Sequence, residues 1–355
     1  MRFGKIDNFI LFGGGRMLCH LALKLQQEKF PVVVFSSQRH LTELVSGEII
    51  LEEFLKQNQI AYFASDNINE DKNINRYLNE GTLGISFGAA WIFNKNIISR
   101  FKGRLLNSHA TRLPQDRGGG GFSWRILNGD QRGCSLIHQI DAGIDTGDIV
   151  KDKEYFFPIL AKTPYDFIAF SLEQNFLFFN EFLEEIKNNF DFPLIKQEER
   201  ASSYYPMLNT RANGLIDWRL TGKDIYLFIN AFDDPYPGAS TFIQHLTNEN
   251  SQQGGAGLIG SKKVFLKDAQ LLEPQTIYHP FTAGLIVRKN NQGIFIATVG
   301  NLLLVKKVID ESGQDILEQL QLGDRLYTPQ AALDQAMTFR AVYDASGLVN
   351  KKGTI

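Results

Sequence analysis

The sequence predicts an α/β protein with an N-terminal Rossmann-like parallel sheet and flanking helices, followed by a smaller C-terminal β-rich domain of the OB-like barrel kind. The chain opens with a strand, a helix and a second strand, the unit from which parallel sheets are built. A long apolar helix follows in mid-chain, and beyond it closely spaced short strands with glycine turns become frequent. At 355 residues, the chain is also too long for one ordinary core.

Changes in composition along the chain give the expected domain boundaries. We expect an N-terminal domain over residues 1–190, a linker over 191–213 and a β-rich domain over 214–355. The segment from Phe190 to Pro206 is polar and carries two prolines, which is typical of a connection between domains.

Alternating apolar runs and amphipathic segments predict the elements of the N-terminal domain. The predicted strands are Asn8–Phe12, Pro31–Phe35, Ile60–Phe63 and Thr82–Phe87, and the predicted helices are Met17–Glu28, Glu48–Gln57, Asn67–Asn79 and Lys95–Arg100. The Gly13–Gly15 turn invites a dinucleotide-binding interpretation. We disfavour it, because Leu18 stands at the third glycine position and the second strand ends in Ser36-Ser37 instead of an acidic residue.

The stretch from Arg104 to Asp148 concentrates the polar residues that could carry chemistry. Asn107 and His109 are two positions apart at the end of a predicted strand, so both side chains point to the same side. The glycine run 118–121 is expected to be loop. Residues 135–140 are expected to form the next strand, and residues 141–148 an acidic, turn-rich loop.

The second half of the chain is predicted to hold one long helix, one short helix and several strands. Thr163-Pro164 has the pattern of an N-cap with proline at the first helical position, so a helix is expected over Tyr165–Asn189. The remaining predicted elements are a helix at Gly222–Phe232 and strands at Ala239–Gln244, Leu258–Ile259, Lys263–Leu272, Ala283–Arg288 and Ile294–Val299.

Charge and cysteine content limit the class of protein. The net charge is −2 and the pI about 6.3, without the basic surplus typical of nucleic-acid binders. Residues 205–355 carry 14 Lys or Arg and 14 Asp or Glu, so this part is neutral. Two cysteines exclude a disulfide framework and indicate a reducing compartment. Lacking a signal peptide or an apolar run of the ~18 residues that a membrane helix needs, the chain is expected to be cytoplasmic and not membrane-bound.

Asn107, His109 and Asp145 are together suited to acyl transfer. An imidazole can accept a proton from an attacking nucleophile, an amide can donate to a developing oxyanion, and a carboxylate can orient the imidazole. The same residues also fit a structural histidine and a solvated acidic turn. Asp141, Asp145 and Asp148 match no cation loop, so no metal is expected.

A set of motifs narrows these alternatives. The first block reads N-x-H, L-P, R-G and D-x-G-x-D-T-G-D-I, at residues 107–109, 113–114, 117–118 and 141–149, with Trp124 between. The second comprises residues 214–218, 229–232 and 234–239, and the tail 321–329 follows it. Together they resemble the N10-formyltetrahydrofolate-dependent formyltransferases. The second block resembles members acting on methionyl-tRNA and, more closely, those acting on nucleotide-linked amino sugars.

The resemblance implies roles for named residues. It implies a catalytic trio of Asn107, His109 and Asp145. The co-substrate N10-formyltetrahydrofolate would lie in a cleft between the end of the fourth strand and the acidic loop, bound by Phe87, Gly88, Ala89, Trp91, Asp141 and Ile144. A tryptophan at the position of Trp91 is, however, more often a core residue than a ligand-binding one. The acceptor would be bound by Arg117, Gly118 and Trp124.

The chain departs from the family pattern on the acceptor side. Ala110-Thr111-Arg112 replaces the usual segment between the histidine and Leu-Pro, the run 118–121 replaces a varied segment, and Asn230 replaces the usual arginine. The favoured function is sugar N-formylation for a bacterial surface polysaccharide. Methionyl-tRNA formylation is the alternative, although the neutral C-terminal part argues against tRNA. A non-catalytic folate- or sugar-binding relic is the third reading. Relatives of the sugar kind are often dimers, so the resemblance also allows a homodimer.

Overall fold

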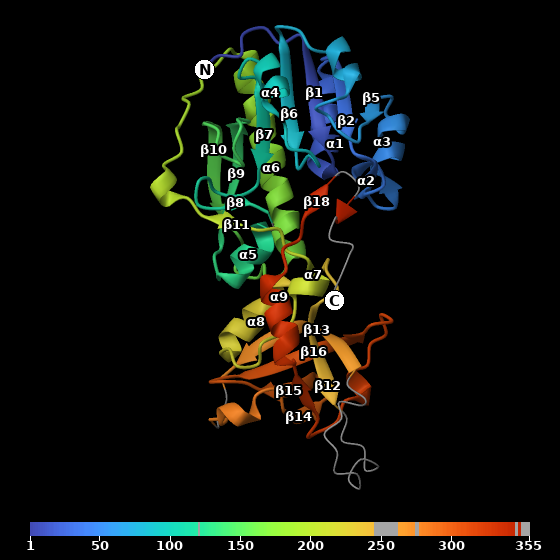
Figure 1. The fold of residues 1–355 in the computed structure, drawn as a ribbon, viewed down its shortest axis with the longest axis vertical. Helices are drawn as coiled ribbons and strands as arrows, with labels where there is room; N and C mark the ends of the chain where they lie inside the picture. Colours follow the sequence, from blue (N-terminus) through green and yellow to red (C-terminus); the bar gives the residue numbers. More distant parts are fainter. Residues whose placement is uncertain (120, 245–261, 274–276, 345–346, 349–355) are drawn as a thin grey trace.

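A seven-stranded sheet forms the centre of the N-terminal part (Figure 1). The computed structural model describes residues 1–119, 121–244, 262–273, 277–344 and 347–348. The strands follow the order β10-β9-β7-β6-β1-β2-β5. Five of them run parallel, and β9 and β10 are antiparallel to their neighbours in the sheet. Their bounds are β1 Asn8–Gly13, β2 Val32–Ser36, β5 Ala61–Ala64, β6 Thr82–Phe87, β7 Leu105–His109, β9 Arg132–Gln139 and β10 Ile149–Phe156.

Helices cover both faces of this sheet, as its apolar strands require. One apolar layer joins the sheet to α1 (Gly15–Gln27), α3 (Leu51–Gln57) and α6 (Pro164–Lys187). The other joins it to the 3-10 helix η1 (Lys72–Arg76) and to α4 (Lys95–Arg100). Shorter elements complete this part: α2 Gln38–Leu41, β3 Leu44–Ser46, β4 Ile49–Ile50, β8 Arg117–Gly118, α5 Gly121–Leu127, η2 Glu199–Ala201 and β11 Tyr204–Tyr205.

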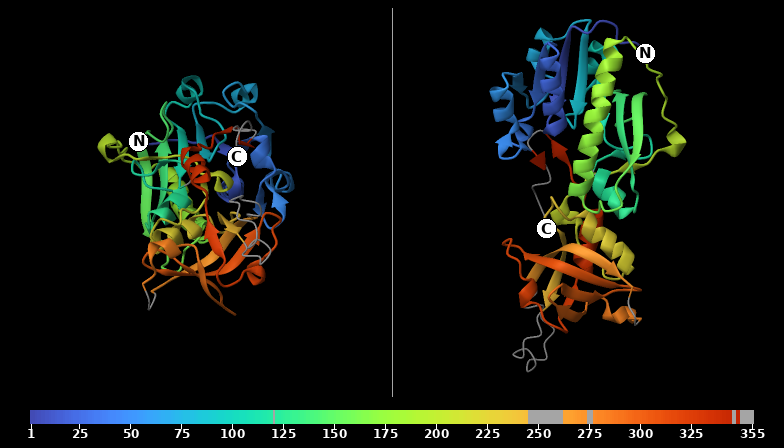
Figure 2. Two further views of the ribbon diagram at one scale, coloured as in Figure 1. Left: turned by 60° about the horizontal axis from the view of Figure 1, so that its bottom comes forward. Right: turned by 180° about the vertical axis from the view of Figure 1, so that it is seen from behind.

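The long helix α6 begins where the sequence predicted. Thr163 Oγ1 accepts a hydrogen bond from the Asp166 amide at 3.3 Å, and the Asp166 carboxylate accepts one from the Thr163 amide at 2.9 Å. This reciprocal capping box satisfies amides that the first turn leaves free, and Pro164 has none to lose. The helix then runs along the sheet away from the C-terminal part, because Phe167 near its start packs in the C-terminal core and Ile186 near its end packs in the N-terminal core. The view from behind shows the helix along the sheet (Figure 2).

The C-terminal part is a curled antiparallel sheet in the order β14-β15-β16-β13-β12-β17. Its edges meet at a bridge between Leu285 and Arg325, so the sheet is barrel-like. Apolar side chains of α8 fill its inner side together with Phe157 and Phe167, which join it to the N-terminal part. The bounds are α7 Thr210–Asn213, α8 Gly222–Ala231, β12 Ala239–Gln244, β13 Lys262–Leu272, η4 Pro280–Thr282, β14 Ile286–Asn290, β15 Gly293–Ala297, β16 Leu302–Asp310, η5 Leu317–Gln319, β17 Arg325–Tyr327, α9 Gln330–Thr338, β18 Tyr343–Asp344 and β19 Gly347–Leu348.

The predicted fold class is confirmed, whereas several elements differ from the prediction. The helix predicted over residues 67–79 is wrong, because only Lys72–Arg76 is helical. Asn67, Asp71 and Asn79 accept hydrogen bonds from nearby backbone amides, which compete with helix formation. The strand predicted at residues 258–259 lies outside the described residues. Strands β10 and β16 and helices α5 and α9 were not predicted from the sequence.

The glycine run 118–121 is not simply a loop. Gly118 pairs with Tyr205 in a two-stranded sheet, and α5 begins at Gly121. Gly118 has φ +95°, and a Cβ there would lie 2.3 Å from the Tyr205 carbonyl oxygen. The pairing partner is remote in sequence, so local pattern could not reveal it. Among the described helices, none is long and apolar enough to cross a membrane.

Candidate active site

Asn107 and His109 lie at the carboxyl end of β7, near the point where strand order reverses between β1 and β6. Both are partly exposed, whereas Leu105 and Leu106 before them are buried. Asp145 approaches them from the loop between β9 and β10. In open α/β sheets ligands bind at this edge, so the fold brings the three predicted residues together where a ligand site is expected.

A backbone carbonyl orients the ring of His109. Its Nε2 lies 3.2 Å from the carbonyl oxygen of Asp116, and because a carbonyl only accepts, Nε2 carries the proton. In the neutral ring Nδ1 is therefore the basic nitrogen. Nδ1 lies 3.9 Å from Asp145 Oδ1, which is too long for a hydrogen bond but close enough to stabilise an imidazolium.

Two hydrogen bonds fix Asp145, and a third fixes the nearby Gly147. Its Oδ2 accepts from the Gly118 amide at 3.0 Å, and its carbonyl oxygen accepts from Gln197 Nε2 at 2.9 Å. The same Nε2 also donates to the Gly147 carbonyl at 2.7 Å. Asp145 has φ +54°, a conformation that is uncommon for a residue with a side chain and clusters at functional sites. The loop is thus held in place from the segment after α6.

His138 is a fourth member of this cluster that sequence reasoning missed. It lies directly across from Asn107 in the β7–β9 pair, and its Nε2 is 3.1 Å from Asn107 Nδ2. Its Nδ1 donates to the Gln139 carbonyl at 2.8 Å, so Nε2 accepts from Asn107. Burial and, second, the neighbouring His109 lower the pKa of His138 to about 4. The available signal was a histidine directly after the apolar residues Leu136 and Ile137 of β9.

A cavity of about 190 Å³ opens beside Asn107, between the end of β6 and the acidic loop. Five of the six residues predicted to bind the co-substrate line it: Gly88, Ala89, Trp91, Asp141 and Ile144. The sixth, Phe87, is buried beneath and packs against Phe179 with ring centroids 5.3 Å apart. Trp91 is fixed by a hydrogen bond from its Nε1 to the Asp66 carbonyl at 3.0 Å. The apolar and polar walls suit a flat, partly polar ligand.

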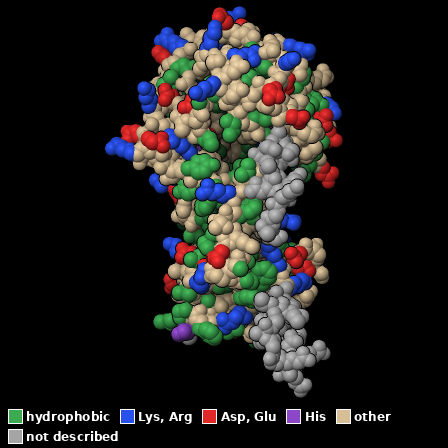
Figure 3. Space-filling model, in the orientation of Figure 1, with side chains coloured by type: hydrophobic (Ala, Val, Ile, Leu, Met, Phe, Trp, Pro, Cys, Tyr) green, Lys and Arg blue, Asp and Glu red, His purple; other side chains and the backbone are tan. Residues whose placement is uncertain are grey.

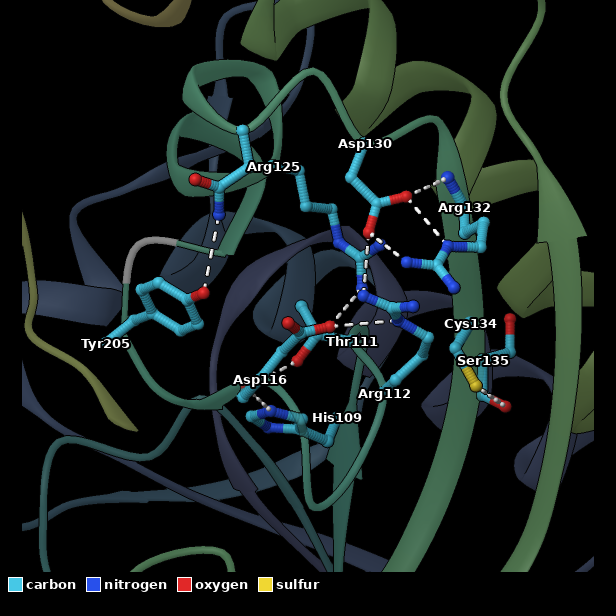
Figure 4. Close-up of polar contacts among 11 residues, drawn as sticks. His109, Thr111, Arg112, Asp116, Arg125, Asp130, Arg132, Cys134, Ser135 and Tyr205 are labelled. Carbon is cyan, nitrogen blue, oxygen red and sulfur yellow. Dashed lines mark hydrogen bonds and ion pairs between the residues drawn. The ribbon is translucent and has the colours of Figure 1, made fainter. Parts of the chain in front are cut away.

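A second, polar cavity of about 440 Å³ adjoins Asp116, whose carbonyl orients His109. Figure 4 shows the ion pairs along its wall. Asp116 Oδ2 accepts from Arg112 Nε at 3.1 Å and from Arg125 Nη2 at 2.9 Å, and Asp130 Oδ2 accepts from Arg112 Nη2 at 2.7 Å. Thr111 Oγ1 donates to the Asp116 carbonyl at 2.9 Å. This network fixes Asp116, whose carbonyl oxygen orients the ring of His109.

The residues predicted to bind the acceptor occupy different places. Trp124 lines the second cavity, with Nε1 donating to the Pro206 carbonyl at 2.9 Å. Gly118 donates its amide to Asp145. The buried guanidinium of Arg117 contacts Gln197 Oε1 and Glu199, so it supports the segment that holds the acidic loop and lines neither cavity.

Two protein-family models match the chain along most of its length. The model described as formyl transferase matches residues 8–165, and the model of the formyl transferase C-terminal domain matches residues 209–320. The chain belongs to the formyl transferase family. This confirms the resemblance drawn from the sequence and makes the protein an enzyme of formyl transfer.

Two curated relatives of this formyltransferase are named methionyl-tRNA formyltransferase. It is 27% identical to the methionyl-tRNA formyltransferase of Desulfotalea psychrophila over 79% of this chain and 74% of that protein. It is 26% identical to the methionyl-tRNA formyltransferase of Prochlorococcus marinus over 80% of this chain and 84% of that protein.

Two of the similar solved structures are named N-formyltransferase and sugar 3N-formyl transferase. An N-formyltransferase from Helicobacter canadensis, in complex with folinic acid and dTDP-3-aminofucose, aligns with TM-score 0.60 and 19% identity over 85% of this chain and 99% of that one. WlaRD, a sugar 3N-formyl transferase in the presence of dTDP and 5-N-formyl-THF, aligns with TM-score 0.59 and 20% identity over 85% and 98%. At these identities the likeness shows a shared fold.

Proposed function

We propose that this formyltransferase moves the formyl group of N10-formyltetrahydrofolate to the amine of a nucleotide-linked amino sugar. The observation that carries the chemistry is the convergence of Asn107, His109 and Asp145 beside the 190 Å³ cavity. The co-substrate is typical of the family, and folates accompany both solved structures described above. The residues predicted to bind the co-substrate lie on the wall of this cavity, which supports placing the folate there.

The reaction needs a base, an oxyanion donor and a leaving group. The amine nitrogen attacks the formyl carbon and forms a tetrahedral intermediate, while its proton passes to Nδ1 of His109. Asn107 has two amide hydrogens, and one of them is engaged by His138, which leaves the other for the oxyanion. Collapse of the intermediate breaks the bond to N10 of the folate, which takes the proton from His109. The carboxylate of Asp145 stabilises the imidazolium between these two steps.

The charge distribution supports a sugar acceptor. Proteins that bind tRNA gather Lys and Arg side chains over the surface that faces the phosphates. Residues 205–355 are neutral overall, and on the face in Figure 3 the basic and acidic side chains are interspersed. The ligands named in the two similar structures include dTDP and a dTDP-linked amino sugar.

A second candidate is methionyl-tRNA formylation, which the names of the curated relatives favour. The chemistry would be the same, with the α-amine of the methionyl group as nucleophile. The two candidates differ in the size and charge of the acceptor, so tRNA binding would fall steeply with rising salt, whereas binding of a nucleotide-linked sugar would depend on salt far less.

An end-point assay decides between them. The enzyme and N10-formyltetrahydrofolate are incubated with a panel of nucleotide-linked amino sugars and, in parallel, with methionyl-tRNA, and mass spectrometry records the gain of one formyl group. Formylated sugar with unmodified tRNA is the expected result. Formylated tRNA with unmodified sugars would overturn the proposed acceptor and leave the formyl-transfer chemistry intact.

A further inference from the structure

We propose that His109, His138 and Asp145 form a binding site for a divalent transition-metal ion of the zinc class, and that the bound ion blocks formyl transfer. The metal-binding half is independent of the proposed acceptor. The inhibitory half rests on the role of His109 as the base. The three residues come from β7, β9 and the β9–β10 loop, so the site exists only in the folded chain.

The distances among the three side chains suit a small cation. Asp145 Oδ1 lies 3.9 Å from His109 Nδ1 and 3.7 Å from His138 Nε2, and all three atoms lie within 4.8 Å of one another. Zinc–ligand bonds of about 2.0–2.2 Å place tetrahedral ligand atoms roughly 3.3–3.6 Å apart. Small side-chain movements therefore close the site around an ion.

The ligand atoms of the three side chains face one another, because the other polar atom of each side chain is hydrogen-bonded to a backbone group. His109 Nε2 faces the Asp116 carbonyl at 3.2 Å and His138 Nδ1 faces the Gln139 carbonyl at 2.8 Å, so both protons point outward. Asp145 Oδ2 accepts from the Gly118 amide at 3.0 Å, which leaves Oδ1 free for a cation. Histidines that ligate metals characteristically donate their other nitrogen to a carbonyl or a carboxylate. Each of the three ligands thus has an outer partner.

Asn107 is the group that an ion must displace. Its Nδ2 donates to His138 Nε2 at 3.1 Å and occupies the lone pair that a metal would take. A half-turn of this amide would direct Oδ1 to the centre as a fourth ligand. Two imidazoles, one carboxylate and one amide or water oxygen form a ligand set that zinc accepts.

Metal binding and catalysis then exclude each other. Both require the lone pair of His109 Nδ1, and the displaced Asn107 amide can no longer donate to the oxyanion. Inhibition by zinc should therefore be reversible by a chelator and should appear as a loss of active enzyme. The sequence, by contrast, predicted no metal, because the spacing of Asp141, Asp145 and Asp148 matches no cation loop.

Binding is measured with the full-length protein after treatment with EDTA and dialysis. Calorimetric titration with zinc chloride alone should give one equivalent of bound ion. His138→Gln and Asp145→Asn should each weaken that binding by at least the roughly 10- to 100-fold that loss of an outer partner costs. The exposed His279 is the matched control, and His279→Gln should bind zinc as the wild type does.

A spectroscopic measurement covers the case in which a variant fails to fold. Cobalt(II) added to wild-type protein should give the intense visible bands of a four-coordinate nitrogen and oxygen site. The weak spectrum of hydrated cobalt would overturn the proposal, as would equal zinc affinity of wild type and folded His138→Gln. Zinc that binds through these residues but leaves formyl transfer unchanged would overturn the inhibitory half. If no nucleotide-linked amino sugar is formylated, the zinc-binding results still hold, so the two proposals can be refuted separately.

Discussion

The side-chain amide of Gln197 donates to the carbonyl oxygen of Asp145 at 2.9 Å, and so ties the segment after α6 to the acidic loop of the site. Its Oε1 in turn accepts from Arg117 Nε at 3.1 Å. A residue outside the motif stretch therefore fixes the position of the carboxylate beside His109.

Replacing Gln197 by glutamate tests this connection. The carboxylate keeps an acceptor for Arg117 but loses the donor to the Asp145 and Gly147 carbonyls. Two lost hydrogen bonds, at ~0.5–1.5 kcal/mol each, correspond to a roughly 5- to 160-fold fall in kcat/KM. Steady-state kinetics measure it, with the exposed Gln292→Glu as control. Unchanged kinetics in Gln197→Glu would contradict a positioning role.

His109→Asn tests the general base. Asparagine cannot accept the amine proton, so turnover should fall by the ~10²- to 10⁴-fold typical of losing a general base. Folate binding, followed by fluorescence or calorimetry, should change little, because His109 does not line the 190 Å³ cavity. Near-normal turnover would remove His109 from the mechanism, and exposed His279→Asn serves as the reference.

Thr111 offers a milder perturbation of the same ring. Its hydroxyl donates to the Asp116 carbonyl that orients His109, so Thr111→Val should lower kcat by about 2- to 10-fold through one lost hydrogen bond. Thr111→Ser keeps the hydroxyl and should stay near wild type. Wild-type activity in Thr111→Val, which keeps a methyl group against Gly121 and loses only the hydroxyl, would show that this hydrogen bond does not orient the ring.

The close approach of β1 to β6 depends on Gly13. It has φ +103°, and a Cβ there would lie 2.2 Å from the Phe87 carbonyl oxygen. Gly13→Ala should cost more than the ~1–3 kcal/mol of backbone strain alone. Gly313→Ala has a positive φ of +86° but meets no atom within 4 Å, so it isolates the strain. Urea unfolding should therefore show a larger loss for Gly13→Ala, and equal losses would refute the steric argument.

Both cysteines should be unreactive in the folded protein. Burial raises the pKa of Cys19 to about 12 and that of Cys134 to about 12. Because the unfolded thiols ionise near 9, the neutral folded thiols add stability that is fully present below pH 9 and is lost as the pH rises toward 12. Reaction with Ellman's reagent at pH 8 should be slow until denaturant is added. Rapid reaction of native protein would show that the thiols are accessible.

The predictions that succeeded rest on local periodicity and on motifs. Strand alternation placed Asn107 and His109 on one side of β7, and the capping pattern at Thr163-Pro164 located the start of α6. One failure arose from local side-chain hydrogen bonds and another from pairing with a distant segment. Asn-rich residues 67–79 satisfied the backbone locally, and the pairing of Gly118 with Tyr205 made a strand of part of a glycine run.

The sequence by itself determined the family, the α/β class and the identity of Asn107, His109 and Asp145 as candidate site residues. Only the tertiary structure decided how these groups are arranged. His138 reaches Asn107 through the register of antiparallel strands, and the Asp116 carbonyl, Gln197 and Gly118 orient the rest. The physical reason is that motifs specify which side chains are present, whereas hydrogen-bond partners and proton positions depend on backbone groups that folding brings together.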